Sequence, residues 1–386
     1  MPSPTRDTVR FIRGWIGGRH LSERDGTPVT SGSLLETGVP GVRTREVVIG
    51  SGTSALHARR YGPRFRRSPA PGWVLLHGVT LPGPAHPAIV RFAAALARSG
   101  AVVLVPDIPS WRRLDLDPRP ARTALARAAE HLAADPRVRP GGVVLVGLSF
   151  GFPQVLRVGA DLARNGVVRG LGGFGSYCRL ANTLRFALTG QFRWRGRTHY
   201  LRPDPYGRWV VAANYLHRVP GCEDAECVSR ALHRLAVLAG ERRILSWDSG
   251  YDVAKDDLEK SIPAAHRPLF RLFAPPADRE PRPGPAREMT GLLADAAHRT
   301  HPELAPPVPR GVLPPPVRLL HGRRDHLIPF TETLALERLL RKRGDVSATI
   351  TGLFAHSRES GPTSSRIRES AGFFTGLKGM MALQYR

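Results

Sequence analysis

Length, composition and charge set the first limits on this chain. It has 386 residues, which suits one large α/β core that carries an insertion. Its formal net charge is +25 at pH 7, from 57 basic and 32 acidic residues, and such an excess raises the question of nucleic-acid binding. The arginines are scattered, however, no nucleic-acid-binding module is recognisable, and the lysines are only Lys255, Lys260, Lys342 and Lys378. The sequence therefore argues against a nucleic-acid partner.

The cysteines and the N-terminal sequence indicate the compartment. Three cysteines are too few, and odd in number, for a disulfide framework, and no Cys/His spacing indicates a metal site. We therefore expect a cytoplasmic protein without metal or cofactor. Residues 1–40 read as an N-terminal extension without a secretory signal, in which residues 8–16 predict a short basic amphipathic helix. Packing of this helix on the core is favoured over contact with a membrane surface.

The first predicted elements of the core are two buried strands separated by a helix. Residues 73–80 contain an apolar strand that ends in His77 and Gly78, and residues 101–107 contain a second one that ends in Pro-Asp. Between them, residues 88–98 carry apolar side chains at helical intervals. Strand, helix and strand in this order predict a parallel pair within an α/β sheet.

The next predicted strand leads into the pentapeptide GLSFG at 147–151. Residues 141–146 are uncharged and rich in valine, as in a central parallel strand, and residues 150–162 carry apolar side chains at helical intervals. G-x-S-x-G between a strand and a helix is the pattern of a nucleophile elbow, with Ser149 as the nucleophile. The glycines are required because a side chain at either position would collide with neighbouring backbone in a strained turn. The alternative, a serine that only caps the helix, is disfavoured by this context.

A serine nucleophile needs a base to take its proton and a carboxylate to orient that base. Asp325 follows a predicted buried strand at 316–322, and His356 follows a helix at 331–343 and a strand at 346–351. A turn aspartate and a loop histidine would be the ordinary interpretations of each residue alone. Their position after successive late strands favours a Ser-Asp-His triad.

In these features the chain resembles the α/β-hydrolase superfamily. In that family the acid lies in a G-x-x-D-x-x-x-P-like turn, which residues 322–329 match, and the histidine follows the last strand, as His356 does. The resemblance implies a mostly parallel central sheet flanked by helices. An apolar pattern through Ile367, Phe374, Leu377 and Met381 suits a closing helix.

The resemblance also implies an oxyanion hole from two backbone N–H groups. These belong to Phe150, the residue after the nucleophile, and to Val79, in the loop after the first apolar strand. Gly78 and Thr80 remain alternatives to Val79. His77 is interpreted as a structural turn residue rather than as a second base.

The separation of Ser149 from Asp325 requires a large insertion. We expect the core at 41–177 and 314–386 and a mainly helical insertion at 178–313, which in α/β-hydrolases usually caps the active site. Helices are predicted at 180–192, 206–217 and 224–238. The proline-rich stretch from 263 to 316 predicts an extended, poorly packed connector.

Two sets of side chains in the insertion invite a functional interpretation. Phe186 and Trp209 are candidates to line an acyl pocket, with a place in the insertion's own core as the alternative. A local basic cluster could attract an anionic substrate or a membrane surface, although a solvated face is favoured; it comprises Arg185, Arg193, Arg195, Arg197 and Arg202.

Together these patterns predict a serine hydrolase that acts on a small-molecule acyl substrate, an esterase or lipase-like enzyme. An acyltransferase with the same triad, or a non-catalytic binding protein on the same fold, are the alternatives. Dehalogenases and epoxide hydrolases of the family are disfavoured, because they have an aspartate where Ser149 stands. Acyl chain length and oligomeric state are not specified by the sequence.

Overall fold

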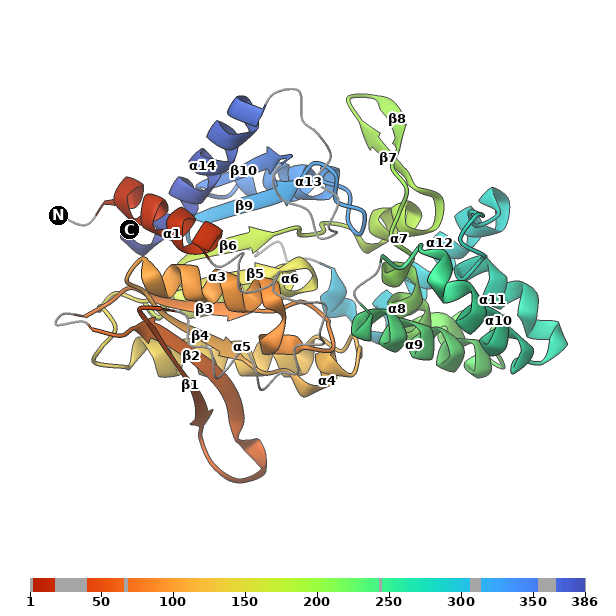
Figure 1. Cartoon of the computed structure of the whole chain (residues 1–386), viewed down its shortest axis with the longest axis horizontal. Helices are drawn as coiled ribbons and strands as arrows, with labels where there is room; N and C mark the ends of the chain where they lie inside the picture. The colour runs from red at the N-terminus through yellow and green to blue at the C-terminus, as the bar shows by residue number, and fades with distance from the viewer. Residues whose placement is uncertain are drawn as a thin grey trace.

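The computed structural model describes residues 3–17, 40–65, 69–242, 245–305, 314–352 and 366–385. Its centre is an eight-stranded sheet with the order β1-β2-β4-β3-β5-β6-β9-β10 (Figure 1). β1 and β2 pair antiparallel, β2 pairs antiparallel with β4, and every other neighbouring pair is parallel. The strands are β1 (Val42–Ile49), β2 (Leu56–Pro63), β3 (Gly72–Leu76), β4 (Val102–Pro106), β5 (Val143–Leu148), β6 (Val168–Phe174), β9 (Val317–Gly322) and β10 (Val346–Thr351).

Two layers of helices cover the sheet, because successive side chains of its central strands are apolar on both faces. On β3, Val74 and Leu76 lie in one buried cluster and Trp73 and Leu75 in another. The first cluster is covered by α5 (Arg119–Ala133), α6 (Phe152–Ala163) and α13 (Thr331–Arg341), and the second by α1 (Pro4–Gly17), α3 (Pro87–Arg98) and α14 (Arg366–Ala382). The predicted mostly parallel sheet flanked by helices is therefore confirmed.

The N-terminal helix α1 packs on the second layer. Phe11 is 2% exposed, and its ring lies edge-on to Phe92 of α3 with centroids 5.2 Å apart. Asp7 accepts hydrogen bonds from Gln384 and Tyr385, near the C-terminal end of the chain. The apolar side of the predicted amphipathic helix thus contacts the core. Among the described helices, none combines the length and apolar composition needed to cross a bilayer.

The segment between β6 and β9 begins as expected with a helix, α7 (Leu180–Thr189), but the prediction of helix through residue 192 is wrong. Gly190 ends α7 in the left-handed conformation, with φ +68°. A hairpin follows, built from β7 (Gln191–Trp194) and β8 (Arg197–Tyr200). Phe192 and Trp194 of β7 lie edge-on to Phe330, which immediately precedes α13. Tertiary contact with that ring favours a strand where the periodicity alone favoured a helix.

The prediction of an extended connector is also wrong in the part that the structure describes. The proline-rich stretch contains α11 (Arg267–Phe273) and α12 (Pro283–Thr300), whose buried residues include Phe270 and Leu293. Proline is compatible with both helices because it stands in the first turn, where its missing N–H has no intrahelical partner. Residues 306–313 of the stretch lie outside the described residues.

The segment between β6 and β9 has a buried core of its own. Its other helices are α8 (Pro205–Tyr215), α9 (Glu226–Glu241) and α10 (Asp252–Lys260). Apolar side chains of this segment form one cluster with residues that follow the sheet strands at their carboxyl ends, among them Leu116, Tyr177 and Ile328. In Figure 1 these helices lie together at one end of the sheet, whereas both chain termini lie at the opposite end.

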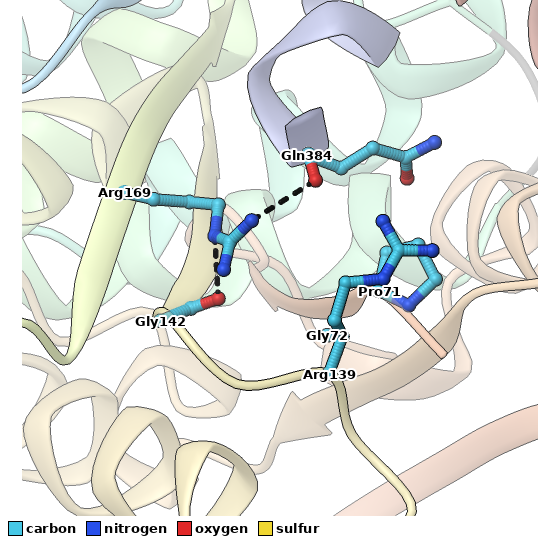
Figure 2. Close-up of a pocket in the computed structure, with 6 residues that line it drawn as sticks. All are labelled: Pro71, Gly72, Arg139, Gly142, Arg169 and Gln384. Carbon is cyan, nitrogen blue, oxygen red and sulfur yellow. Dashed lines mark hydrogen bonds between the residues drawn. The ribbon is translucent and has the colours of Figure 1, made fainter. Parts of the chain in front are cut away.

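A hydrogen-bond network of Arg169 lies at that opposite end of the strands. Arg169 of β6 donates hydrogen bonds to the carbonyl oxygens of Gly142 at 2.8 Å, Gln384 at 3.1 Å and Pro140 at 2.6 Å. Figure 2 shows the first two of these bonds, with the Arg139 side chain beside them. The guanidinium thereby joins the start of β5 to the C-terminal end of the chain, on the side of the sheet away from Ser149.

Candidate active site

Ser149 stands in the turn between β5 and α6, in a strained conformation. Its φ is +52°, which L-residues with a side chain rarely adopt. A Cβ atom on Gly147 would lie 2.5 Å from Phe152 Cα, and one on Gly151 would lie 3.1 Å from the carbonyl oxygen of Leu76. The two glycines are therefore required by close backbone approach, as the pentapeptide predicted. The turn presents Ser149, which is partly exposed, at the carboxyl end of the sheet.

The loop after β3 lies directly beside this turn. A Cβ atom on Gly78 would be 3.5 Å from both Ser149 Cβ and the carbonyl oxygen of Leu148. The next residue, Val79, is partly buried, as is Phe150. The loop that carries Val79 thus lies against the turn that carries Ser149 and Phe150, the arrangement that an oxyanion hole from these two residues would need.

His77 is an uncharged structural residue at this place. The side chain is fully buried, and its Nδ1 lies 2.7 Å from the carbonyl oxygen of Gly78, to which it donates. Burial lowers the pKa of His77 to about 4. Its Nε2 has no hydrogen-bond partner among the described residues. The ring stabilises the loop that carries Val79, in agreement with its interpretation as a turn residue.

Two buried aromatic side chains pack against Phe150 of the elbow. Trp111 of α4 (Pro109–Arg112) lies edge-on to Phe150, with ring centroids 5.4 Å apart, and also to His77 at 6.0 Å. Tyr177 stacks on Phe150 at 6.1 Å, and its hydroxyl donates to the carbonyl oxygen of Leu304. Nothing in the sequence singled out Trp111, in a single-turn helix after β4, or Tyr177, just after β6, because each takes its role from tertiary packing.

Asp325 is a buried carboxylate in a tight turn after β9. It is 1% exposed, and its Oδ1 accepts hydrogen bonds from the backbone N–H groups of Leu327 at 2.9 Å and Ile328 at 3.0 Å. Its Oδ2 lies 3.1 Å from Nε2 of His321, the penultimate residue of β9. The side chain of His321 is also fully buried. Sequence reasoning treated His321 only as part of a strand.

The sheet places Ser149 and Asp325 at the same edge. Ser149 follows β5, Asp325 follows β9, and β6 alone lies between these strands. Their strands are thus two strand spacings apart, roughly 10 Å. His356, the predicted base, lies outside the described residues. The structure therefore places the predicted nucleophile, the predicted acid and the loop after β3 at the same edge of the sheet, and the position of His356 stays a prediction.

The two substrate-contact candidates of the insertion are both fully buried. Trp209 belongs to the cluster of apolar side chains within the segment, and its Nε1 donates to the carbonyl oxygen of Phe273 at 2.9 Å. Phe186 packs edge-on against Phe192 at 6.0 Å. These contacts favour the alternative that both residues form the insertion's own core.

All three cysteines lie in the part of the chain that the structure describes, and none of them forms a disulfide.

The arrangement of the sheet decides the fold. An eight-stranded sheet in which β2 alone runs opposite to the other strands carries a G-x-S-x-G elbow after β5 and a buried aspartate after β9. The chain has the α/β-hydrolase fold. Its large additional segment lies between β6 and β9.

Comparison with known proteins gives distant similarities to solved structures. No family model matches the chain, and no curated protein does. Among solved structures it is similar to brefeldin A esterase, described as a bacterial homologue of human hormone sensitive lipase, at 14% identity over 100% of this chain and 86% of that chain, with a TM-score of 0.47. It is similar to an esterase from the archaeon Pyrobaculum calidifontis at 17% identity over 97% and 93%, with a TM-score of 0.48. The thermophilic carboxylesterase EstE1 from a metagenomic library shows 14% identity over 98% of both chains, with a TM-score of 0.45.

Proposed function

We propose that this α/β-hydrolase is a serine hydrolase that cleaves a carboxylic ester through an acyl-enzyme. The observation that carries the proposal is the strained elbow: Ser149 holds φ +52° between two glycines that close backbone contacts require. Strain of this kind persists only where the surrounding structure enforces it, and it is characteristic of functional sites. The buried Asp325, at the same edge of the sheet, supplies the carboxylate that a serine triad needs.

In the proposed reaction His356 is the base. Ser149 Oγ attacks the acyl carbonyl carbon while His356 takes the hydroxyl proton, and Asp325 stabilises the resulting imidazolium. The tetrahedral intermediate expels the alcohol, which receives that proton from His356. Water then attacks the acyl-enzyme with His356 again as the base, and Ser149 leaves with its proton restored. An alcohol in place of water would give an acyltransferase.

The negative charge that develops on the carbonyl oxygen is assigned to backbone N–H groups of Phe150 and Val79. Support comes from the close approach of Gly78 to Ser149, which puts the loop after β3 against the elbow. Fixed N–H donors stabilise an oxyanion without reorganisation during the reaction. The packing of His77 and Trp111 around this loop fixes its geometry.

We further propose that the segment between β6 and β9 is a cap over the site. Val79 and Phe150 are packed against the apolar cluster of this segment, and a Cβ atom on Gly240 of α9 would lie 2.7 Å from Leu81 Cδ1. Hydrogen bonds also fix the segment to the core: Asn214 of α8 accepts from the N–H of Leu116 at 3.0 Å. These contacts favour a cap that is packed in place and that limits access of water and long acyl chains to Ser149.

Turnover of graded p-nitrophenyl esters tests the proposal. Wild-type protein should release p-nitrophenol and free acid, whereas Ser149→Ala should reduce the rate by at least about 10³-fold. Ser176→Ala is the matched control, because Ser176 is a second serine just beyond a central strand, β6, and is itself buried, and the rate of this variant should stay within about threefold of wild type. Equal rates in wild-type and Ser149→Ala protein would refute the function. Ester formation in the presence of an alcohol would indicate acyl transfer instead.

A further inference from the structure

Asp325 has a side-chain neighbour that the proposed mechanism does not use. Two backbone N–H groups hold its Oδ1, whereas its Oδ2 lies 3.1 Å from His321 Nε2. The same nitrogen lies 2.9 Å from the carbonyl oxygen of Ile328. Both side chains are completely buried, so no bulk water replaces these contacts. A buried carboxylate depends strongly on each donor that faces it.

The surroundings of Nε2 fix the position of its proton. A carbonyl oxygen accepts hydrogen bonds but cannot donate them, and the same holds for an ionised carboxylate. Nε2 therefore carries a proton: it donates a hydrogen bond to the Ile328 carbonyl oxygen at 2.9 Å, and Asp325 Oδ2 faces the same N–H group at 3.1 Å. The Ile328 carbonyl oxygen and Asp325 Oδ2 thus share one N–H group of His321, whichever form its other nitrogen takes.

The opposite side of the ring is held as well. His321 Nδ1 lies 2.6 Å from Thr333 Oγ1, at the start of α13, and that hydroxyl lies 3.1 Å from the carbonyl oxygen of Ser176. Thr333 is fully buried. A ring restrained at both nitrogens cannot rotate away from the carboxylate. Three segments, at the ends of β6 and β9 and the start of α13, thus converge on this histidine.

We propose that His321 is a positioning residue for Asp325: its Nε2–H holds Oδ2 so that the carboxylate keeps the orientation in which it supports the catalytic base. The role rests on the proposed function, since it acts through the Asp325 of that triad. Loss of the N–H donor should lower kcat about 10- to 100-fold, the range typical of groups that orient an active-site residue from behind. Substrate affinity should not change, because His321 makes no contact with the acyl group.

The test compares His321→Phe, which removes the donor, with His321→Gln, which offers an amide N–H. For both we would measure kcat and KM on a p-nitrophenyl ester, the rate of Ser149 labelling by a fluorophosphonate, and the folded fraction. We expect His321→Phe to lose about 10- to 100-fold in kcat and in labelling rate, with KM within about twofold, and His321→Gln to recover to within about fivefold of wild type. Leu336→Ala, a buried core variant on the same helix as Thr333, is the control for lost stability and should keep wild-type kcat per folded molecule.

An unchanged kcat in folded His321→Phe, or an equal loss in His321→Gln, would overturn the positioning role while leaving the proposed function intact. If His321→Phe does not fold, Thr333→Val decides instead. It removes the second contact of the ring and should lower kcat about 3- to 10-fold at unchanged KM, so an unchanged kcat overturns the role. Absence of both turnover and Ser149 labelling in the wild-type protein would overturn the proposed function, and this role with it.

Discussion

At the scale of single residues, the account depends on the carboxylate and the base that it supports. Replacement of Asp325 by Asn, or of His356 by Ala, should lower kcat by about 10³- to 10⁴-fold with little effect on folding. In Asp325→Asn the imidazole would lose its orientation, and in His356→Ala the serine would lose its proton acceptor. Steady-state kinetics with a chromogenic ester, beside circular dichroism, gives the answer. A near-normal rate in Asp325→Asn would indicate that another carboxylate is the acid, and Asp107, just after β4, would be the next candidate.

A second residue-scale prediction concerns stability toward acid. Burial lowers the pKa of His77 to about 4 in the folded chain, whereas an unfolded histidine titrates near 6.5. Below pH 6.5 the unfolded state therefore binds a proton that the folded state does not, and stability falls as the pH drops from about 6.5 to about 4. The loss from this group should reach about 3 kcal/mol.

Urea denaturation at pH 7, 5.5 and 4.5 measures this effect. His77→Asn should show a smaller decrease in unfolding free energy across the series than wild type, whereas His233→Asn, at a partly exposed position on α9, should show the same decrease as wild type. Parallel decreases in wild type and His77→Asn would show that other groups cause the acid sensitivity.

Residue by residue, the sequence predicted the turns of Ser149 and Asp325, because there the signal was local. The glycines around Ser149 and the aspartate after a buried strand are adjacent in sequence to the elements that position them. His321 was not recognised, because its contacts with Asp325 and Thr333 depend on the turn after β9 and on where α13 begins. Trp111 was missed for a similar reason, since its packing against Phe150 joins the short helix α4 to the elbow, two segments that are distant in sequence.

At the scale of elements, the core was predictable and the insertion was only partly so. Buried parallel strands are continuous apolar runs, and the strand predicted at 346–351 coincides with β10. In the insertion, proline was taken as a breaker, although Pro283 begins α12 and is compatible with its first turn. The β7-β8 hairpin was missed because its strands are short and are stabilised by Phe330, outside the insertion's own sequence.

The proposed cap leads to a prediction for two residues: replacement of one should change stability, and replacement of the other should change substrate choice. Trp209 is fully buried in the insertion's core, so Trp209→Ala should lower the unfolding free energy by about 3–5 kcal/mol without a specific change in substrate choice. Leu81 is partly buried where α9 meets the oxyanion loop. Leu81→Ala should change the ratio of kcat/KM between long and short acyl esters by roughly 10-fold.

Chemical denaturation and kcat/KM for p-nitrophenyl acetate, butyrate and octanoate separate the two effects. The reverse result, a selectivity change in Trp209→Ala at wild-type stability, would place the acyl pocket inside the insertion rather than at its junction with the core. An unchanged ratio of kcat/KM between long and short esters in Leu81→Ala would argue against a cap that contacts the acyl chain near α9.

At the scale of the whole molecule, part of the arginine content has a structural explanation. Several arginines donate to main-chain carbonyl oxygens in the manner of Arg169: Arg208 is buried and binds the carbonyl oxygens of Phe273 at 2.7 Å and Ala187 at 3.1 Å, near the ends of α11 and α7. Burial lowers the pKa of Arg208 to about 10, which still leaves it charged at neutral pH. A planar guanidinium with five donors suits this use better than lysine.

We therefore expect weak binding to nucleic acid despite a net charge of +25. Fluorescence anisotropy with a labelled DNA duplex should give a Kd no tighter than about 10⁻⁶ M at physiological salt, and the affinity should fall steeply as salt rises. A sequence-selective complex that survives roughly 200 mM salt would require a nucleic-acid role for the arginines.

The central claim, that Ser149 is a covalent nucleophile, is tested most directly by mapping the adduct of a fluorophosphonate probe. The reagent should label the native protein at one residue, and mass spectrometry of the digest should place the phosphonyl group on Ser149, with no adduct after denaturation or in Ser149→Ala. An adduct on another serine, such as Ser176 or Ser357, or no labelling of an active preparation, would contradict the claim.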